Sequence, residues 1–251
     1  MSILPLLALT LLTLQIPQSS TAAVIDSCSA AAQALMGQAS TRAQEFDLPG
    51  AFALLKEAAS DGACDEAGAQ FEYVEGLLGA AEAARQGGTV YSLRDVRSAV
   101  HALLWRAAGK GGAWEAGSVA LQATIAASQY EREEMALYLE HATRLELLQL
   151  AAGQRGVPLI TALELAGDLW LQVHRFEDAR RAYERAMEHV GRTSRITFGL
   201  GRAAARVQDG RTACAEYQRL LEWWDARAAS PPEIEEARMY IASPACTTTR
   251  Q

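Results

Sequence analysis

Two segments of this chain, residues 160–193 and 194–227, repeat each other at a spacing of 34 residues. Residues of the same type recur at matching positions: Gly167 and Gly201, Val173 and Val207, Ala179 and Ala213, Tyr183 and Tyr217, Arg185 and Arg219, Glu188 and Glu222. A fixed period in this range is typical of stacked helical hairpins, because one hairpin alone cannot bury its apolar face. Such arrays are usually binding scaffolds, so the repeat favours a protein that works by presenting a surface.

Each copy divides into two helices around a polar turn, at residues 173–175 in the first and 208–210 in the second. In copy one the apolar positions follow the spacing of a single buried stripe on each helix: Leu163, Ala166, Gly167 and Trp170, then Phe176, Ala179, Tyr183 and Ala186. We expect the glycines of this pattern to lie where two helix axes approach closely. The two matching tyrosines should fill the space between hairpins.

With these positions the two segments resemble tetratricopeptide repeats. The first helices match at Ala166–Gly167 and Leu200–Gly201, and the second helices match at Ala179, Tyr183 and Ala186 and at Ala213, Tyr217 and Leu220. Trp170 and Phe176 match the family in copy one only, and Gly191 and Asp225 stand where a proline is usual. The resemblance implies an all-α fold, a right-handed superhelical array of antiparallel helix hairpins, with two repeats in residues 159–227.

The segments on either side of the repeats are predicted to extend the array. Residues 24–158 read as divergent hairpins of the same kind; Ala51, Leu55 and Ala58, for example, follow the spacing of a repeat's second helix. Residues 228–251 read as a capping helix and a tail, with Ser230 as N-cap and prolines in the first turn. Abundant alanine and the lack of alternating strand patterns also favour the all-α class.

The first 23 residues predict a secretory signal peptide. Residues 2–16 are apolar and uncharged, and a short stretch of small and polar residues follows. The start lacks Lys and Arg, so a short membrane anchor is the alternative, but about 14 apolar residues fall below the roughly 20 that span a bilayer. Lipid attachment at Cys28 is disfavoured by Asp26. We therefore expect a periplasmic or secreted protein, an exported bacterial type of tetratricopeptide repeat protein, without stable membrane insertion.

Charge and motifs argue against several other functions. The formal net charge of −7 disfavours nucleic acid, whose phosphates require a basic face. The sequence Gly-Lys-Gly-Gly at 109–112 lacks the spacing of a phosphate-binding loop. The four histidines are scattered, and no nucleophile with its base can be recognised. We therefore expect no catalytic residues, no cofactor and no metal site.

The four cysteines are predicted to form two disulfides, which is usual for an even number in an exported chain. Cys28 begins one predicted helix and Cys64 follows the helix that returns beside it. Cys214 opens the second helix of the last repeat and Cys246 follows the capping helix. Antiparallel packing would bring each pair together, so we expect Cys28–Cys64 and Cys214–Cys246. Free buried thiols are the alternative.

The candidate binding residues lie on the first helices of the two repeats, which line the concave surface in the family. Copy two carries three arginines and an aromatic residue on one face, and copy one carries polar residues on the equivalent face: Arg195, Phe198, Arg202 and Arg206, then Glu164, Asp168 and Gln172. Arginine suits bidentate recognition of a carboxylate. The alternative is a solvated face in which Asp168 and Arg202, at matching positions, pair with each other.

These observations favour a non-enzymatic interaction scaffold of the cell envelope that binds a protein or peptide in the concave groove. One alternative is an accessory protein that binds a small ligand or carbohydrate, with Trp105 and Trp114 as aromatic platforms. Another is a structural subunit that oligomerises through its convex face.

Overall fold

The computed structural model describes residues 28–60, 64–87, 93–110, 114–153, 158–224 and 230–247. Within these ranges all regular structure is helical, and no strand is present, which confirms the predicted all-α class. No helix of the described residues is long and apolar enough to cross a bilayer. The predicted signal peptide, residues 1–23, lies outside the described ranges.

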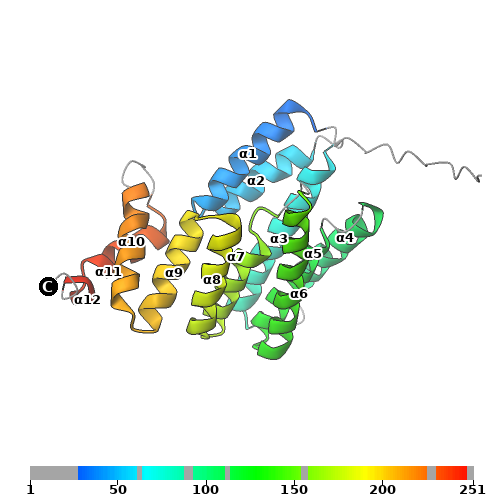
Figure 1. Cartoon of the computed structure of the whole chain (residues 1–251). Helices are drawn as coiled ribbons and strands as arrows, with labels where there is room; N and C mark the ends of the chain where they lie inside the picture. The colour runs from blue at the N-terminus through cyan, green and yellow to red at the C-terminus, as the bar shows by residue number, and fades with distance from the viewer. Residues whose placement is uncertain are drawn as a thin grey trace, which may run out of the picture.

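Within the described ranges, consecutive helices pack as five hairpins followed by a cap (Figure 1). In chain order the helices are α1 (Ala30–Gln44), α2 (Leu48–Ala59), α3 (Asp65–Arg85), α4 (Arg94–Lys110), α5 (Glu115–Ser128), α6 (Arg132–Ala151), α7 (Ala162–Gln172), α8 (Phe176–Val190), α9 (Ser194–Arg206), α10 (Gly210–Trp224), α11 (Pro232–Ile241) and α12 (Pro244–Thr247). The first helices α3, α5, α7 and α9 also pack on one another in order. The hairpins therefore form a row, as the repeat predicts.

Four hairpins share one corner conformation. Their corner residues have positive φ although none is glycine: Phe46, Tyr130, His174 and Gln208. In each corner the next amide donates to a carbonyl five residues back, for example Arg175 N–H to Trp170 O at 2.9 Å and Asp209 N–H to Ala204 O at 2.9 Å. The left-handed conformation costs such residues about 1 kcal/mol or more. Its recurrence shows that the N-terminal hairpin is built like the two clear repeats.

Glycines of α7 and α9 make room for buried tyrosine rings, so a tyrosine side chain, and not the axis of a second helix, is what lies closest to them. The ring of Tyr183 is 1% exposed, and a Cβ added at Gly167 would lie 2.4 Å from it. Gly199 of the next hairpin is equally close to the same ring, at 2.2 Å. Gly201 stands in the same relation to Tyr217, at 3.0 Å. Tyr183 therefore packs against both α7 and α9.

The capping helix continues the spacing of the repeats. Asp168, Arg202 and Glu236 follow one another at 34 residues on α7, α9 and α11, and the guanidinium of Arg202 lies 3.0 Å from the carboxylate of Glu236. Trp224 packs under this helix and is 2% exposed, whereas Trp223 is 44% exposed. One tryptophan of the pair therefore supports the cap, and the other faces solvent.

The N-terminal hairpin does not simply begin the row but lies across it (Figure 1). Its corner reaches the last repeat, where the ring centroid of Phe46 lies 5.6 Å from that of Phe198 and 5.8 Å from that of Trp224. The hydroxyl of Ser194 donates to the backbone carbonyl of Gln44 beside it. These contacts join residues 150 or more positions apart in the sequence.

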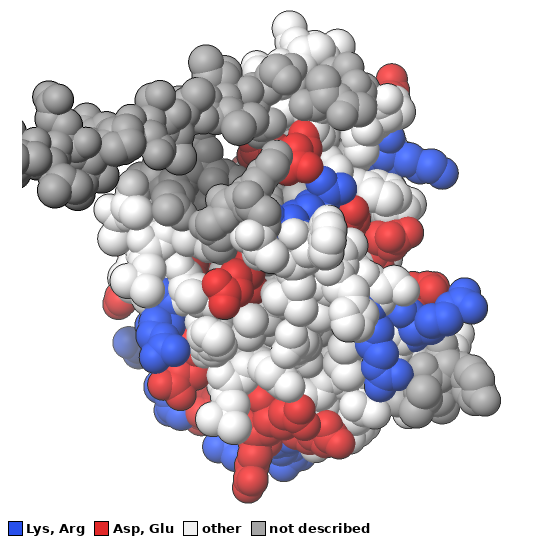
Figure 2. All heavy atoms as spheres, turned by 90° about the vertical axis from the view of Figure 1, so that its right-hand side faces the viewer, with Lys and Arg blue, Asp and Glu red and all other residues white. Residues whose placement is uncertain are grey.

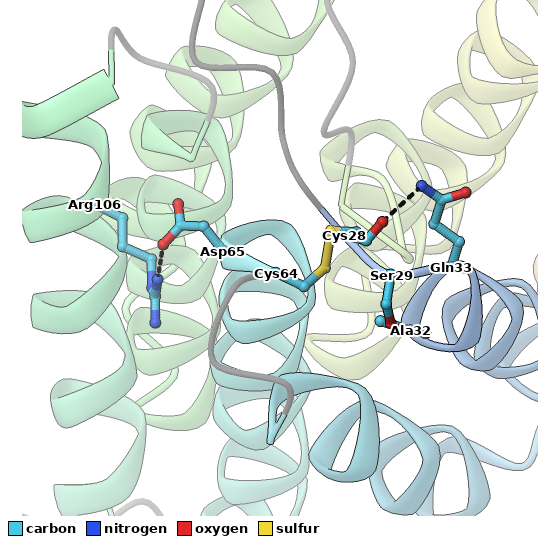
Figure 3. Close-up of a disulfide and its surroundings, with 7 residues drawn as sticks. All are labelled: Cys28, Ser29, Ala32, Gln33, Cys64, Asp65 and Arg106. Atoms are coloured by element: carbon cyan, nitrogen blue, oxygen red, sulfur yellow. Dashed lines mark hydrogen bonds and ion pairs between the residues drawn. A yellow bond between two sulfur atoms is a disulfide. The ribbon is translucent and has the colours of Figure 1, made fainter.

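Both predicted disulfides are present, and no described cysteine is free. Cys28–Cys64 joins the start of α1 to the start of α3, where Arg106 of α4 also binds Asp65 (Figure 3). Cys214–Cys246 joins α10 to α12 and so holds the capping segment against the last hairpin. Each end of the described chain is thereby fixed to its neighbouring helices.

Candidate functional site: a pocket lined by arginine and aromatic side chains

A pocket of about 430 Å³ opens between α7, α9, the α1–α2 corner and α11. Its volume falls in the range of ligand sites. The side chains that line it come from all four of these elements, from the α7–α8 turn and from the start of α8: Phe46, Asp168, Leu171, Gln172, His174, Phe176, Arg195, Phe198, Arg202, Arg206 and Glu233. The fold-back of the N-terminal hairpin therefore supplies one wall of the pocket.

Arg195 is held in place by two carboxylates of α7. Its Nε lies 2.7 Å from Glu164 Oε1, and its Nη2 lies 2.7 Å from Asp168 Oδ2. Asp168 in turn accepts a hydrogen bond from the hydroxyl of Tyr183. Glu164 is 2% exposed, so its ion pair with Arg195 is largely shielded from water. The guanidinium is fixed by the scaffold before any ligand arrives.

The proton affinities of this cluster follow from its burial. Burial raises the pKa of Glu164 to about 7; Arg195 opposes the shift, and the charge of Asp168 adds to it. For Arg195, burial alone would lower the pKa, but the charges of Asp168 and Glu164 outweigh it and leave the pKa above its usual value. Burial, reinforced by Asp168, also raises the pKa of Tyr183 well above its usual value. Arg195 and Tyr183 therefore keep their protons at neutral pH, and Glu164 is the group that titrates there.

The other two arginines differ in how far they are neutralised. Arg202 is paired with Glu236 of α11, and its guanidinium carbon lies 5.4 Å from the ring centroid of Phe198. Arg206 is exposed and stands over Phe176 at 5.8 Å, with no carboxylate partner among the described residues. Glu233, across the pocket on α11, also lacks an ion pair within the described part of the chain. Counting the described residues alone, the pocket thus presents one cation and one anion without an ion-pair partner.

Six of the seven sequence-predicted binding residues line this single pocket: Asp168, Gln172, Arg195, Phe198, Arg202 and Arg206. The seventh, Glu164, lies behind Arg195 and contacts it directly. Sequence reasoning missed Phe46, because it is remote in the chain, and Leu171, His174, Phe176 and Glu233. The position of Glu233 and the capping helix α11 could have been predicted by extending the 34-residue spacing from α9 to α11.

The alternative of a self-paired face is confirmed for Arg195 and Arg202, but the suggested pair of Asp168 with Arg202 is wrong. Asp168 binds Arg195, and Arg202 binds Glu236. Arg195 lies two turns before Arg202, about 10 Å along α9, so matching positions of adjacent repeats do not stand opposite each other. The first turn of α9 instead lies beside the middle of α7.

The two tryptophans suggested as sugar platforms do not lie at this pocket. Trp114 is buried in the core at 6% exposure, whereas Trp105 of α4 is 83% exposed, and neither lines the pocket. On the face that Figure 2 shows, the described Lys and Arg side chains are interspersed with Asp and Glu and do not merge into a basic surface. The described residues also contain no group of three or more side chains placed to hold a metal ion.

No protein-family model matches this chain, and neither the curated proteins nor the solved structures include a significant match. We therefore infer the function from the geometry of the pocket.

Proposed function

We propose that the protein is a non-enzymatic interaction scaffold whose pocket binds a peptide segment of a partner protein through an acidic group and an apolar side chain. The observation that carries this proposal is Arg206, an exposed cation without a carboxylate partner among the described residues, placed over Phe176 at the edge of the pocket. In this proposal Arg206 binds the carboxylate of the ligand.

The walls support an apolar side chain next to that carboxylate. Phe46, Phe176 and Phe198 enter the pocket from three different elements, and Leu171 adds a fourth apolar surface. Burial of one leucine- or phenylalanine-sized side chain contributes about 1.5–3 kcal/mol. Because Glu233 is unpaired within the described residues, a ligand that also carries a positive charge fits better than a polyanion.

The chemistry of the lining favours a peptide over a carbohydrate. Among the described residues that line the pocket, Gln172 is the one amide, and none carries a hydroxyl group. A sugar presents many hydroxyl groups, and most of them would lose their partners in water without gaining new ones here. A peptide side chain with one carboxylate needs fewer polar partners.

The preformed state of the pocket also suits a scaffold. Arg195 and Arg202 are already fixed by Glu164, Asp168 and Glu236, so binding does not have to order them.

The two disulfides are typical of proteins of oxidising compartments. Together with the apolar segment at residues 2–16, they support export and a periplasmic or secreted location. The right-handed superhelix of tetratricopeptide repeats is the arrangement that we propose for the hairpin row.

The proposal is tested by selecting peptides from a random library on the purified protein and measuring their affinities by fluorescence polarisation. Arg206→Glu should weaken the selected peptides by about tenfold or more, because it replaces a charge-assisted hydrogen bond with repulsion. The matched control is Arg211→Glu, the same change at an exposed position of α10 that does not line the pocket. It should bind like the unchanged protein. Equal binding by both variants would place the ligand elsewhere.

A further inference from the structure

A second surface, on α6, carries exposed apolar side chains of its own. Leu137 is 68% exposed and Leu148 is 63% exposed, although leucine is costly to leave in water. Glu140 and Arg144 stand between them at helical spacing, also exposed, so the four residues form one stripe along the helix. We call Leu137, Glu140, Arg144 and Leu148 the α6 stripe.

Two hollows lie beside the α6 stripe, at the groove that separates α6 from α8. The first, of about 280 Å³, is lined by Ala136, Leu139, Glu140, Thr143, Leu163, Ala166, Trp170, Asp178, Arg181, Ala182 and Arg185. The second, of about 350 Å³, is lined by Glu140, Arg144, Leu147, Leu148 and Arg185. Each hollow is large enough for a leucine side chain. The surface therefore combines protruding leucines with places that could receive them.

Some of the charges around these hollows are not neutralised within the described chain. Arg181 is bound to Asp178 at 2.5 Å. By contrast, Glu140, Arg144 and Arg185 form no ion pair among the described residues, although Glu140 and Arg144 are four positions apart on one helix. These three groups can bind charges on another molecule without breaking an existing pair.

The α6 stripe is complementary to itself. Its residues are arranged almost symmetrically about the point between Ala142 and Thr143, with a leucine at each end and opposite charges near the centre. When two such helices pack antiparallel, Leu137 of each copy lies opposite Leu148 of the other, and Glu140 of each copy lies opposite Arg144 of the other. A two-fold symmetric interface requires such reciprocal contacts. If residue i of the first copy contacts residue j of the second, then residue j of the first copy contacts residue i of the second.

We propose that the protein forms a two-fold symmetric dimer in which the α6 stripes of two copies pack antiparallel. Leu137 of one copy enters the hollow beside Leu148 of the other, and Glu140 faces Arg144 across the interface. The second copy is the occupant because this surface demands a partner with two leucines and reversed charges at the same spacing. A second copy of the α6 stripe, rotated by 180°, provides these leucines and charges.

Dimerisation through α6 leaves the arginine- and aromatic-lined pocket open. α7 contributes Leu163, Ala166 and Trp170 to the hollow beside α6, but Asp168, Leu171 and Gln172 to the pocket. The two sites thus use different faces of the same helix. A dimer would carry two pockets and could hold two segments of a partner at once, which raises the effective affinity.

Sedimentation equilibrium on the protein expressed from its full coding sequence tests the proposal. Over a range from low to high micromolar concentration, the mass should rise to twice that of the monomer. Glu140→Arg or Arg144→Glu alone should raise the dimer dissociation constant by about tenfold or more, because each change creates two repulsive contacts. The double variant Glu140→Arg/Arg144→Glu should restore dimerisation to within about threefold, because the opposed pairs are again complementary.

The matched control is Glu57→Arg, the same charge change at an exposed position of α2. It should dimerise like the unchanged protein, and circular dichroism should show that all variants are equally helical. A protein that stays monomeric at every concentration overturns the proposal, and so does a dimer that neither single change weakens. Single changes that weaken the dimer without rescue by the double variant exclude the antiparallel arrangement.

Discussion

The ring of Tyr183 lies between two glycines, and replacing either by alanine should destabilise the protein. A Cβ at Gly167 would lie 2.4 Å from Tyr183 Cε1, and a Cβ at Gly199 would lie 2.2 Å from Tyr183 Cζ. Carbon atoms in contact need about 3.5–4.0 Å, so the ring would have to move by more than about 1 Å. The ring is buried, and its hydroxyl binds Asp168, which in turn holds Arg195.

The magnitude follows from two opposing effects. Overpacking at a buried position costs about 1–3 kcal/mol, and the upper part of that range applies because the ring cannot move freely. Alanine gains about 1 kcal/mol over glycine inside a helix. We therefore expect Gly167→Ala and Gly199→Ala each to lower the free energy of unfolding by about 1–2 kcal/mol.

Gly37 provides the matched control, because it also lies inside a helix but a Cβ there would meet nothing within 4 Å. Gly37→Ala should raise the free energy of unfolding by about 0.5–1 kcal/mol. Urea unfolding with the disulfides intact, followed by circular dichroism, measures all three variants. If Gly167→Ala and Gly199→Ala stabilise the protein as Gly37→Ala does, Tyr183 does not pack against these glycines.

Three further changes test the contact between the N-terminal hairpin and the last repeat, the buried cluster around Glu164, and the attachment of the cap. Phe46→Ala removes the contact with Phe198, so it should lower the free energy of unfolding by about 2 kcal/mol and speed hydrogen exchange in α1. Because folding raises the pKa of Glu164 from 4.5 to about 7, the native state binds the extra proton, and stability should fall as pH rises through this range, by roughly 2–3 kcal/mol. Glu164→Gln should remove this part of the dependence when unfolding is measured at pH 5 and pH 8. Replacing Cys214 and Cys246 by serine should cost about 3–4 kcal/mol in urea unfolding for a separation of 32 residues, and a smaller loss would mean that the cap holds without the bond.

Much of the fold could be predicted from the sequence because hairpins are local structures. The 34-residue spacing, the small residues at Gly167 and Gly201 and the large ones at Tyr183 and Tyr217 encode contacts between neighbouring helices. The disulfides were predictable for the same reason, since an antiparallel hairpin brings its two ends together. The candidate arginines were identified as residues of one helix face, which needs only the helical period.

The parts that the sequence did not predict depend on contacts between distant elements. Nothing in the residues around Phe46 indicates that this corner reaches Phe198, because the two are far apart in the chain and no repeat relates them. The pairing of Asp168 depends on the axial offset between α7 and α9, which the repeat period does not specify. Arg195 is therefore bound by two carboxylates, and Arg206 is the arginine of the pocket that has no ion pair within the described part of the chain.

The most direct test of the binding pocket is a photo-crosslinking measurement with a peptide selected on the unchanged protein. A photoreactive amino acid is placed at Gln172, which lines the pocket, and in a separate variant at Glu188, which is exposed on α8. If the pocket is the binding site, irradiation joins the peptide to the protein at position 172 and not at position 188, and Arg206→Glu abolishes the product. A crosslink of equal yield at both positions, or one at position 172 that survives Arg206→Glu, would contradict the proposed site.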